Sequence, residues 1–504
     1  MTEIPRILPV DDHDQEWIAN VHPENWKNPE PADRYHLVVI GAGTAGLVSA
    51  IGSASLGARV ALVERHLMGG DCLNVGCVPS KGVIRAARAW QAVAEGPAYG
   101  APVAAGDGDF AAAMRRMRRL RAKISQVDSA ARYRDLGVDV FLGEGRFVGP
   151  DAMEVGGARL EFRRAVIATG ARASAPPIPG LEEAGYLTNE TIFSLEERPG
   201  RFAVIGAGPI GCEMGQAFAR LGSEVHLLEK TDHILPREDQ DAARIVEQAM
   251  LRDGVRLECA SEITGVERKG DEKVLRYQCG GHPKSITVDQ ILVSVGRAPN
   301  VEGLDLEVAG VEYDRHGVTV DDRLRTSNPR IYAAGDIAGR YKFTHVADAH
   351  AQIVIRNALF FGRARASRLV IPWCTYTSPE IAHVGMYEKD AKEMGYAVDT
   401  ITVSLDENDR ALLDGEDAGF FRVHLEAGKD KILGATLITE HAGEMISEIS
   451  LAMTAGLGLS RIGSTIHPYP TQADVFRRAA SVWRKRKLTP LAKKILSFML
   501  RIVR

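Results

Sequence analysis

The sequence predicts an α/β protein that contains two Rossmann-like dinucleotide-binding units. Three observations lead to this prediction. A glycine-rich turn occurs twice in the same strand–turn–helix–strand context, an acidic residue follows each turn at the same distance, and a cysteine pair comes just after the first unit. The chain has 504 residues, which is enough for about three or four domains.

The bulk composition excludes several classes of protein. Lys and Arg total 62 against 66 for Asp and Glu, so the net charge is −4, which argues against general nucleic-acid binding. Six cysteines are too few for a disulfide framework. The N-terminus lacks the features of a secretory signal, and no apolar run is long enough to span a bilayer. We therefore expect a cytoplasmic protein with no nucleic-acid partner.

The first nucleotide-binding unit lies in residues 36–64. A β-branched run leads into Gly41-Ala-Gly43-Thr-Ala-Gly46, a helical stretch follows, and a second apolar strand ends at Glu64. We expect Gly41 to permit the tight turn, Gly43 to let the backbone approach a pyrophosphate, and Gly46 to let the helix pack on the strand. The helix N-terminus would bind the phosphates, and Glu64 would accept hydrogen bonds from a ribose.

The pattern recurs in residues 202–229. The acid, here Glu229, again comes 23 positions after the first glycine (41 to 64 and 206 to 229). Two dinucleotides are therefore expected, with a hydride passing between them. Glu229 would repel the 2′-phosphate of NADPH, so NADH is the expected nucleotide and NADPH the alternative, although Lys230 weakens this inference. The glycines of this second turn are Gly206, Gly208 and Gly211.

The stretch GGDCLNVGCVPSK, residues 69–81, carries the cysteine pair Cys72 and Cys77. Zinc sites need about four ligands, often as CxxC pairs, so this CxxxxC spacing predicts no metal site. Residues five apart on a regular helix point about 140° apart. A disulfide needs Cα atoms within about 6.8 Å, so residues 74–76 must distort the helix. We interpret the pair as a redox-active disulfide, with inert buried thiols as the alternative.

This stretch resembles the active-site motif of the class I pyridine nucleotide–disulfide oxidoreductases, which include glutathione reductase, dihydrolipoamide dehydrogenase and mercuric reductase. Four further segments also match this family, and their order along the chain makes the match specific. These segments are AVIATGA (165–171), VSVGRAPN (293–300), TSNPRIYAAGD (326–336) and YTSPEIAHVG (376–385).

The resemblance implies FAD and NAD domains and an α+β C-terminal dimerisation domain, and therefore a homodimer. The expected domains are an N-terminal arm (1–34), the first part of the FAD-binding domain (35–182), the NAD(P)-binding domain (183–303), the second part of the FAD-binding domain (304–370), the dimerisation domain (371–482) and a basic amphipathic tail (483–504).

The resemblance also implies roles for individual residues. Cys72 would be the interchange thiol that meets the substrate, and Cys77 the charge-transfer thiol against the flavin. Lys81 and Glu213 would form a buried ion pair near flavin N5, so that removing one partner would cost several kcal/mol. Electrons would pass from NADH through FAD to the disulfide and on to an acceptor. The matching segments also place Thr169, Gly170, Gly296, Arg297 and Asp336 at the cofactors, with Asp336 on the ribityl chain of the flavin.

The acceptor is indicated by the C-terminal segment IHPYPTQAD, residues 466–474. Thiol–disulfide members of the family carry His-Pro-Thr-x-x-Glu there, and the histidine is an acid/base contributed by the partner subunit. In this chain Tyr469 stands at the histidine position and Asp474 at the glutamate position, while His467 matches an outer, non-catalytic histidine. Tyrosine has a pKa near 10, so it is a poor proton shuttle at neutral pH.

Mercuric reductases resemble this chain more closely, because they also carry tyrosine at that position and because NDRA (408–411) fits them. Two of their features are not found here, an N-terminal metal-carrying CxxC domain and a C-terminal vicinal cysteine pair, since the last cysteine is Cys374. We expect a mercuric reductase-like enzyme acting on a small-molecule or metal-ion acceptor. Dihydrolipoamide dehydrogenase or another disulfide reductase is one alternative. A membrane-docked electron relay or redox sensor is another, and Tyr469 as ordinary interface packing remains open.

The C-terminal tail is strongly basic. After Asp474 the sequence has ten Lys and Arg and no acidic residue. Apolar residues recur at helical spacing in 491–502, which is typical of a basic amphipathic helix that lies on a membrane surface. We expect peripheral contact of residues 483–504 with the cytoplasmic face of a membrane, the alternative being a helix packed on its own protein.

Overall fold

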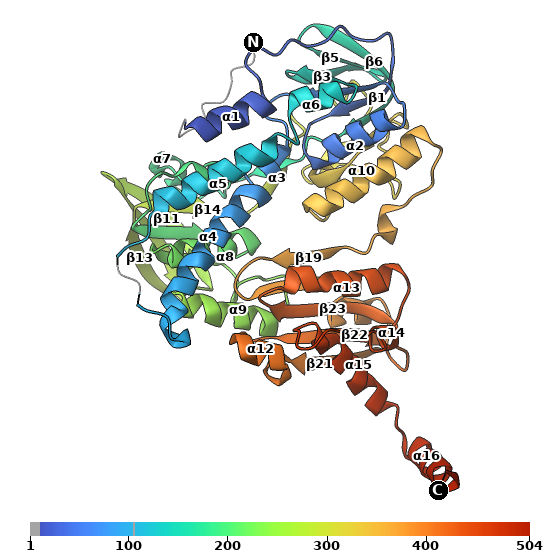
Figure 1. Cartoon of the computed structure of the whole chain (residues 1–504). Coiled ribbons are helices and arrows are strands. Elements are labelled where there is room, and N and C mark those ends of the chain that lie inside the picture. The colour runs from blue at the N-terminus through green and yellow to red at the C-terminus, as the bar shows by residue number, and fades with distance from the viewer. Residues whose placement is uncertain (1–10, 104–105, 504) are drawn as a thin grey trace. The chain divides into compact units, whose positions relative to one another are not determined.

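The computed structural model describes residues 11–103 and 106–503 and divides into two compact units. The first unit contains the described residues up to 232 together with 254–369. The second contains 233–253 and the chain from 370 onward. Helix α9 (Gln240–Arg252), which comes from the segment predicted to bind NAD(P), belongs to the second unit (Figure 1).

The main sheet of the first unit forms because its central strands are apolar on both faces, as strands of a buried parallel sheet are. Val38 on β1 pairs in parallel with Ala61 on β2 and with Ala165 on β6, and all three are fully buried. The strand order is β3-β2-β1-β6-β5-β4, with β18 parallel to β6. Its strands are β1 (Tyr35–Ile40), β2 (Val60–Glu64), β3 (Val138–Leu142), β4 (Gly145–Gly149), β5 (Ala152–Val155), β6 (Ala158–Ile167) and β18 (Ile331–Ala333).

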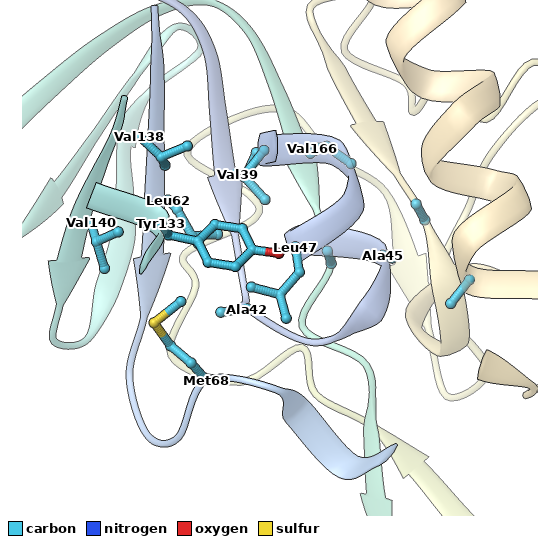
Figure 2. Close-up of a cluster of buried hydrophobic side chains, with 14 of the residues drawn as sticks. Val39, Ala42, Ala45, Leu47, Leu62, Met68, Tyr133, Val138, Val140 and Val166 are labelled. Atoms are coloured by element: carbon cyan, nitrogen blue, oxygen red, sulfur yellow. The ribbon is translucent and has the colours of Figure 1, made fainter. Parts of the chain in front are cut away.

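One face of this sheet packs against helix α2 (Thr44–Ser55), and Figure 2 shows the resulting core. Val39 and Leu62 from the strands meet Leu47 from the helix, and Tyr133 and Met68 fill the space beside them. Burying each large apolar side chain contributes roughly 1.5–3 kcal/mol. The other helices of this domain are α3 (Gly70–Asn74), α4 (Cys77–Glu95), α5 (Phe110–Ser125), α6 (Ala130–Asp135) and α10 (Thr344–Leu359).

The second glycine-rich turn belongs to a smaller parallel sheet with strand order β10-β9-β8-β14. Helix α8 (Pro209–Arg220) connects β8 to β9, so this unit repeats the β1–α2–β2 arrangement. An antiparallel sheet, β11-β12-β13, and a strand pair, β7–β15, accompany it. The strands are β7 (Ala171–Ala173), β8 (Arg201–Ile205), β9 (Glu224–Leu228), β10 (Arg256–Glu258), β11 (Ser261–Lys269), β12 (Glu272–Cys279), β13 (His282–Val288), β14 (Gln290–Val293) and β15 (Arg297–Pro299).

The second unit is built on a five-stranded antiparallel sheet with strand order β19-β20-β23-β22-β21. Its core contains Phe421 on β22 and Phe476 on α15, whose rings meet edge to face at 4.7 Å. The elements are β19 (Pro372–Thr375), β20 (Glu380–Gly385), α11 (Glu388–Glu393), β21 (Val398–Ser404), α12 (Asp409–Asp414), β22 (Phe420–Glu426), β23 (Ile432–Thr439), α13 (Ala442–Thr454), α14 (Leu459–Ile462), α15 (Asp474–Arg486) and α16 (Pro490–Ile502).

The C-terminal tail differs from the prediction in its helix boundaries. Residues 483–486 complete helix α15, and Thr489 then caps a separate helix, α16, by accepting a hydrogen bond from the Ala492 amide. No residue of α16 is buried, so it does not pack on the described part of this chain. Within residues 11–103 and 106–503, no helix combines the length and the apolar character needed to cross a bilayer.

The N-terminal arm contains a helix that was not predicted from the sequence. Helix α1 (Asp12–Val21) is capped by Asp11, and it packs on α5 of the first unit through the buried side chains of Trp17 and Val21. Pairs of apolar residues at helical spacing are too few here to have indicated the helix. Residues 1–10 of the predicted arm lie outside the described residues.

Candidate active site

In the first glycine turn, two glycines are required by the protein itself. Gly41 has φ +96°, and a Cβ there would lie 2.5 Å from the carbonyl oxygen of Ala168. A Cβ on Gly46 would lie 1.8 Å from the Gly41 oxygen, so only glycine lets α2 approach β1. A Cβ on Gly43 would meet nothing closer than 3.7 Å. A side chain on Gly43 would therefore not clash with the protein itself, so we expect this glycine to admit a ligand at the N-terminus of α2, where backbone N–H groups favour an anion.

The second turn repeats this division of roles. A Cβ on Gly211 would lie 1.9 Å from the Gly206 oxygen, and Gly206 has φ +99°. A Cβ on Gly208 would meet no atom within 4 Å. Gly208 precedes α8 as Gly43 precedes α2, so the two turns are equivalent at this point, and phosphate binding there stays a prediction.

The two acids also occupy equivalent positions. Glu64 accepts hydrogen bonds from the amides of Ala42 and His66, and Glu229 accepts them from Ala207 and Thr231, at 2.7–2.9 Å. Each carboxylate thus fastens its glycine turn to the end of the next strand. Burial raises the pKa of Glu64, although the two amide hydrogen bonds oppose this shift. Contact of either acid with a ribose stays a prediction.

The cysteines lie in the redox loop, which we define as residues 70–77. Helix α3 ends at Asn74 and helix α4 begins at Cys77, so the helix is broken between the two cysteines, as predicted. Gly76 is needed there, because its Cβ would lie 2.7 Å from the Asp71 oxygen. The break brings the two thiols close together, and a hydrogen bond between them shifts the pKa of each.

The two thiols differ in protonation. The hydrogen bond from Cys72 is the largest influence lowering the pKa of Cys77 to about 6. The Thr344 hydroxyl, whose Oγ1 lies 3.5 Å from Cys77 Sγ, and the charge of Lys81 lower it further, against desolvation. The same hydrogen bond and burial raise the pKa of Cys72. Cys77 is therefore the thiolate at neutral pH, and Cys72 holds the proton.

The predicted ion pair is present: Lys81 Nζ lies 2.8 Å from Glu213 Oε2. Burial of both charges beside the flavin stays a prediction for Lys81. Its side chain is 37% exposed, whereas that of Glu213 is 7% exposed. Solvent screens the lysine, so breaking the pair should cost less than breaking a fully buried pair.

A polar network beside the redox loop was not found from the sequence. Arg297 Nη2 lies 2.7 Å from Asp71 Oδ2 and 3.8 Å from Asp336 Oδ2. Asn189 donates from Nδ2 to Asp71 Oδ1 (3.1 Å) and to the Val75 carbonyl (3.2 Å). Burial raises the pKa of Asp336, and the charge of Arg297 opposes that shift. Arg297 and Asp336 are thus brought together next to the redox loop.

The remaining predicted cofactor residues join two crossing segments. Thr169 donates its hydroxyl to the Asn300 carbonyl (2.8 Å), and the Gly170 carbonyl accepts from the Asn300 amide (3.0 Å). Gly296 has φ +78°, and its Cβ would lie 2.6 Å from Ser174 Oγ. These contacts fasten β7 to β15, and a direct cofactor contact of these three residues stays a prediction.

In the second unit, the segment around Tyr469 meets the NDRA stretch. Tyr469 is 78% exposed and donates its hydroxyl to Asp409 Oδ2 (3.1 Å), which raises the pKa of Tyr469. Arg478 links this pair to Asp474, with its Nη2 3.6 Å from Asp409 and its Nε 3.0 Å from Asp474. Asp409 was not singled out from the sequence, although NDRA was.

His467 and Asp474 each interact with other residues and do not form a His–carboxylate pair with each other. The side chain of His467 is only 5% exposed, and its Nε2 lies 3.1 Å from Glu448 Oε1. Asp474 accepts from Arg477 and Arg478; although burial raises the pKa of Asp474, these hydrogen bonds lower it overall. Buried and held by Glu448, His467 is poorly placed to exchange protons with a substrate.

Comparison with known protein families supports the family resemblance inferred from these motifs. The model of the pyridine nucleotide-disulphide oxidoreductases matches residues 35–351, and the model of their dimerisation domain matches residues 371–480. The chain belongs to the pyridine nucleotide-disulphide oxidoreductases. The family's fold accounts for the two Rossmann-like domains and the α+β C-terminal domain, and the dimerisation domain supports formation of a homodimer.

Individual relatives in the family have different acceptors. The mercuric reductase of Bacillus cereus is 36% identical over 459 residues, which cover 91% of this chain and 73% of that protein. The dihydrolipoyl dehydrogenase of Thermus scotoductus is 35% identical over 465 residues, covering 90% and 98%. Among solved structures, a Cu(II) complex of the HOCl-induced flavoprotein disulfide reductase of Escherichia coli is 27% identical, with a TM-score of 0.79 and coverage of 88% and 99%.

This oxidoreductase uses FAD and NAD(P)H, the cofactors of its family. The two turns fit these groups, because Gly43 and Gly208 leave open space where a pyrophosphate must approach. When bound, FAD and NAD(P)H would supply the hydride and electron transfer. The residues of this chain hold the nucleotides and place the two thiols.

Proposed function

We propose that this oxidoreductase carries electrons from NADH to the Cys72–Cys77 disulfide and on to a metal-ion acceptor, as mercuric reductases do. The observation that carries this proposal is the unequal thiol pair at the break between α3 and α4. Reduction of the disulfide breaks the S–S bond, adds two electrons and one proton, and yields the Cys77 thiolate and the protonated Cys72. Cys77 then lies beside the positive charge of Lys81, and Cys72 is the thiol that meets the acceptor.

A metal ion suits this site better than an organic disulfide does. Thiolates are soft ligands that bind soft metal ions. Transfer of two electrons from the dithiol to one Hg(II) ion or to two Cu(II) ions re-forms the disulfide and releases the proton of Cys72 to solvent. Reduction of an organic disulfide instead needs a proton donor for the leaving thiolate. Tyr469 occupies the position of that donor, and its pKa is raised above its usual value by Asp409. The mercuric reductase relatives and the Cu(II) complex of the Escherichia coli relative support the same choice.

The test is NADH oxidation by the purified holoenzyme with Hg(II) plus excess thiol, with Cu(II), with lipoamide and with glutathione disulfide. We expect turnover with a metal ion that is lost in Cys77→Ala. Turnover with lipoamide alone would contradict the proposal and favour the dihydrolipoamide dehydrogenase alternative, which the Thermus scotoductus relative supports. Slow turnover with every soluble acceptor would favour a membrane-docked relay or redox sensor.

We also propose that Glu229 gives the enzyme its preference for NADH. The half-buried carboxylate is fixed by the amides of Ala207 and Thr231, so it cannot swing away from a 2′-phosphate without losing both hydrogen bonds. Lys230 is exposed and lies 3.8 Å from Glu262, so part of its charge is directed to that partner. Glu229→Ala should lower the ratio of kcat/KM for NADH to that for NADPH, and an unchanged ratio would contradict this role.

We further propose that α16 binds an anionic membrane surface. At about 100° per residue, its apolar side chains cover an arc of about 200° and its basic residues lie on the remaining arc. All the large apolar side chains are exposed, and no acidic residue follows Asp474. Each basic residue near an anionic leaflet contributes about 1 kcal/mol. The apolar arc contains Leu491, Ile495, Leu496, Phe498, Met499, Leu500 and Ile502, and the polar arc contains Lys493, Lys494, Ser497 and Arg501.

Co-sedimentation with liposomes tests this contact with a matched pair of variants. Ile495→Asp and Ser497→Asp add the same charge to opposite faces of α16. We expect binding to anionic vesicles to be lost in Ile495→Asp and in a chain ending at Leu488, but largely kept in Ser497→Asp. Equal binding by all four chains, or none by the full-length chain, would contradict the proposal. Neutral vesicles separate the contribution of charge from that of the apolar face.

A further inference from the structure

The N-terminal helix α1 reaches the redox loop. The Trp17 indole donates from Nε1 to Asn74 Oδ1 at 2.8 Å, and both side chains are buried. Asn74 is the last residue of α3 and lies between the two cysteines in the sequence. The family match begins at Tyr35, so Trp17 comes from a part of the chain to which the family model assigns nothing.

A buried ion pair reinforces this contact. Arg121 on α5 lies 2.8 Å from Asp14 on α1, and both are almost completely buried. The Arg121 guanidinium lies 3.7 Å from the centroid of the Trp17 ring and donates from Nη1 to the Asn74 carbonyl at 3.0 Å. Burying two charges is costly unless they are paired and hydrogen-bonded. The same arginine therefore joins α1 to the backbone of the redox loop.

Asn74 forms hydrogen bonds through its side-chain nitrogen, its side-chain oxygen and its main-chain carbonyl. Its Nδ2 donates to the Met68 carbonyl at 3.1 Å, its Oδ1 accepts from Trp17, and its carbonyl accepts from Arg121. The preceding residue, Leu73, is buried in the same core cluster as Trp17. The end of α3 is thus fixed at the point where the helix must break for the two thiols to meet.

We propose that Trp17 and Arg121 are positioning residues that set the redox potential of the Cys72–Cys77 pair by holding Asn74. This inference rests on the proposed redox role of the pair. In the disulfide form the S–S bond itself restrains the loop. In the dithiol form only non-covalent contacts do so. Loss of the restraint on Asn74 therefore gives more freedom to the dithiol than to the disulfide, which favours reduction and makes the potential less negative.

The test measures the thiol–disulfide equilibrium of the full-length holoenzyme in dithiothreitol redox buffers. Free thiols are trapped by alkylation, and the peptide that contains the redox loop is analysed by mass spectrometry. Trp17→Phe removes the indole donor and keeps an apolar ring. Trp26→Phe is the matched control, because Trp26 lies in the same arm, donates to the Val140 carbonyl at 3.1 Å and has Arg134 over its ring, but does not touch the redox loop. We expect Trp17→Phe to shift the equilibrium about tenfold toward the dithiol, or about 30 mV.

Arg121→Lys provides a second variant should Trp17→Phe not fold, since it keeps a charge opposite Asp14 but loses the planar guanidinium that reaches Asn74. It should shift the equilibrium in the same direction. Potentials of Trp17→Phe and Arg121→Lys equal to those of Trp26→Phe and the wild type would overturn the inference. A wild-type enzyme whose Cys72 and Cys77 never interconvert with a disulfide would instead refute the proposed function, so the two failures are distinguishable.

Discussion

The thiolate character of Cys77 depends on one hydrogen bond, which can be removed without changing the fold. Cys72 is the largest influence lowering the pKa of Cys77 to about 6, from an ordinary value of 9.0. Cys72→Ala deletes the donor, whereas Cys72→Ser keeps a hydroxyl that donates in the same place. With a pKa of about 6, about nine tenths of Cys77 is thiolate at pH 7. If the pKa rises to 8 or above, at most about one tenth of Cys77 is thiolate at pH 7.

The assay is the pH dependence of Cys77 alkylation by iodoacetamide, followed by mass spectrometry of the peptide that contains it. The midpoint of the profile reports the pKa and is independent of the intrinsic nucleophilicity, which itself changes with pKa. We expect a midpoint near 6 for Cys72→Ser and a midpoint more than one pH unit higher for Cys72→Ala. The remaining shift in Cys72→Ala reflects Thr344 and Lys81 acting against desolvation. Equal midpoints in the two variants would refute the reasoning.

Three other sets of substitutions test separate parts of the site. Gly43→Ala should fold normally but bind FAD at least tenfold more weakly in a fluorescence titration. Gly46→Ala should yield little folded protein, because its Cβ would lie 1.8 Å from a carbonyl oxygen. Equal FAD affinity of Gly43→Ala and wild type would contradict the role of the first turn. Lys81→Met should lower the free energy of unfolding in urea by about 1–2 kcal/mol, a modest loss because the lysine is partly exposed. Adding Glu213→Gln should restore most of this loss. No loss in the single variant would show that the pair is not stabilising. Tyr469→Phe should change stability by less than about 0.5 kcal/mol, because the side chain is exposed. If Tyr469 contacts the bound metal, as the resemblance to mercuric reductases implies, the same substitution should lower metal-dependent turnover several-fold and leave reduction of the flavin by NADH unchanged. Unaltered turnover would assign Tyr469 to packing.

The parts of the fold that the sequence predicted well are those specified by neighbouring residues. The two glycine turns could be predicted because Gly41 and Gly46 meet each other within one strand–turn–helix, and Gly206 and Gly211 do the same. The break in the helix between the cysteines followed from helix geometry alone. The ion pair between Lys81 and Glu213 came from a family resemblance, since 132 positions separate the two residues.

The missed features are contacts between distant parts of the chain. Asn189 and Arg297 reach Asp71 across 118 and 226 positions, and no local pattern announces either contact. Helix α1 was missed for a related reason, because Trp17 and Asn74 meet across 57 positions and the arm has too few apolar residues to show a helical period.

The central claim is that Cys72 and Cys77 accept electrons from the reduced flavin, and anaerobic titration of the holoenzyme with NADH tests it most directly. A flavin and a disulfide each take two electrons, so the wild type should consume about two equivalents of NADH per FAD before NADH accumulates. Cys77→Ala, which has no disulfide at this site, should consume about one. A wild-type endpoint of one equivalent, identical to that of Cys77→Ala, would contradict the account.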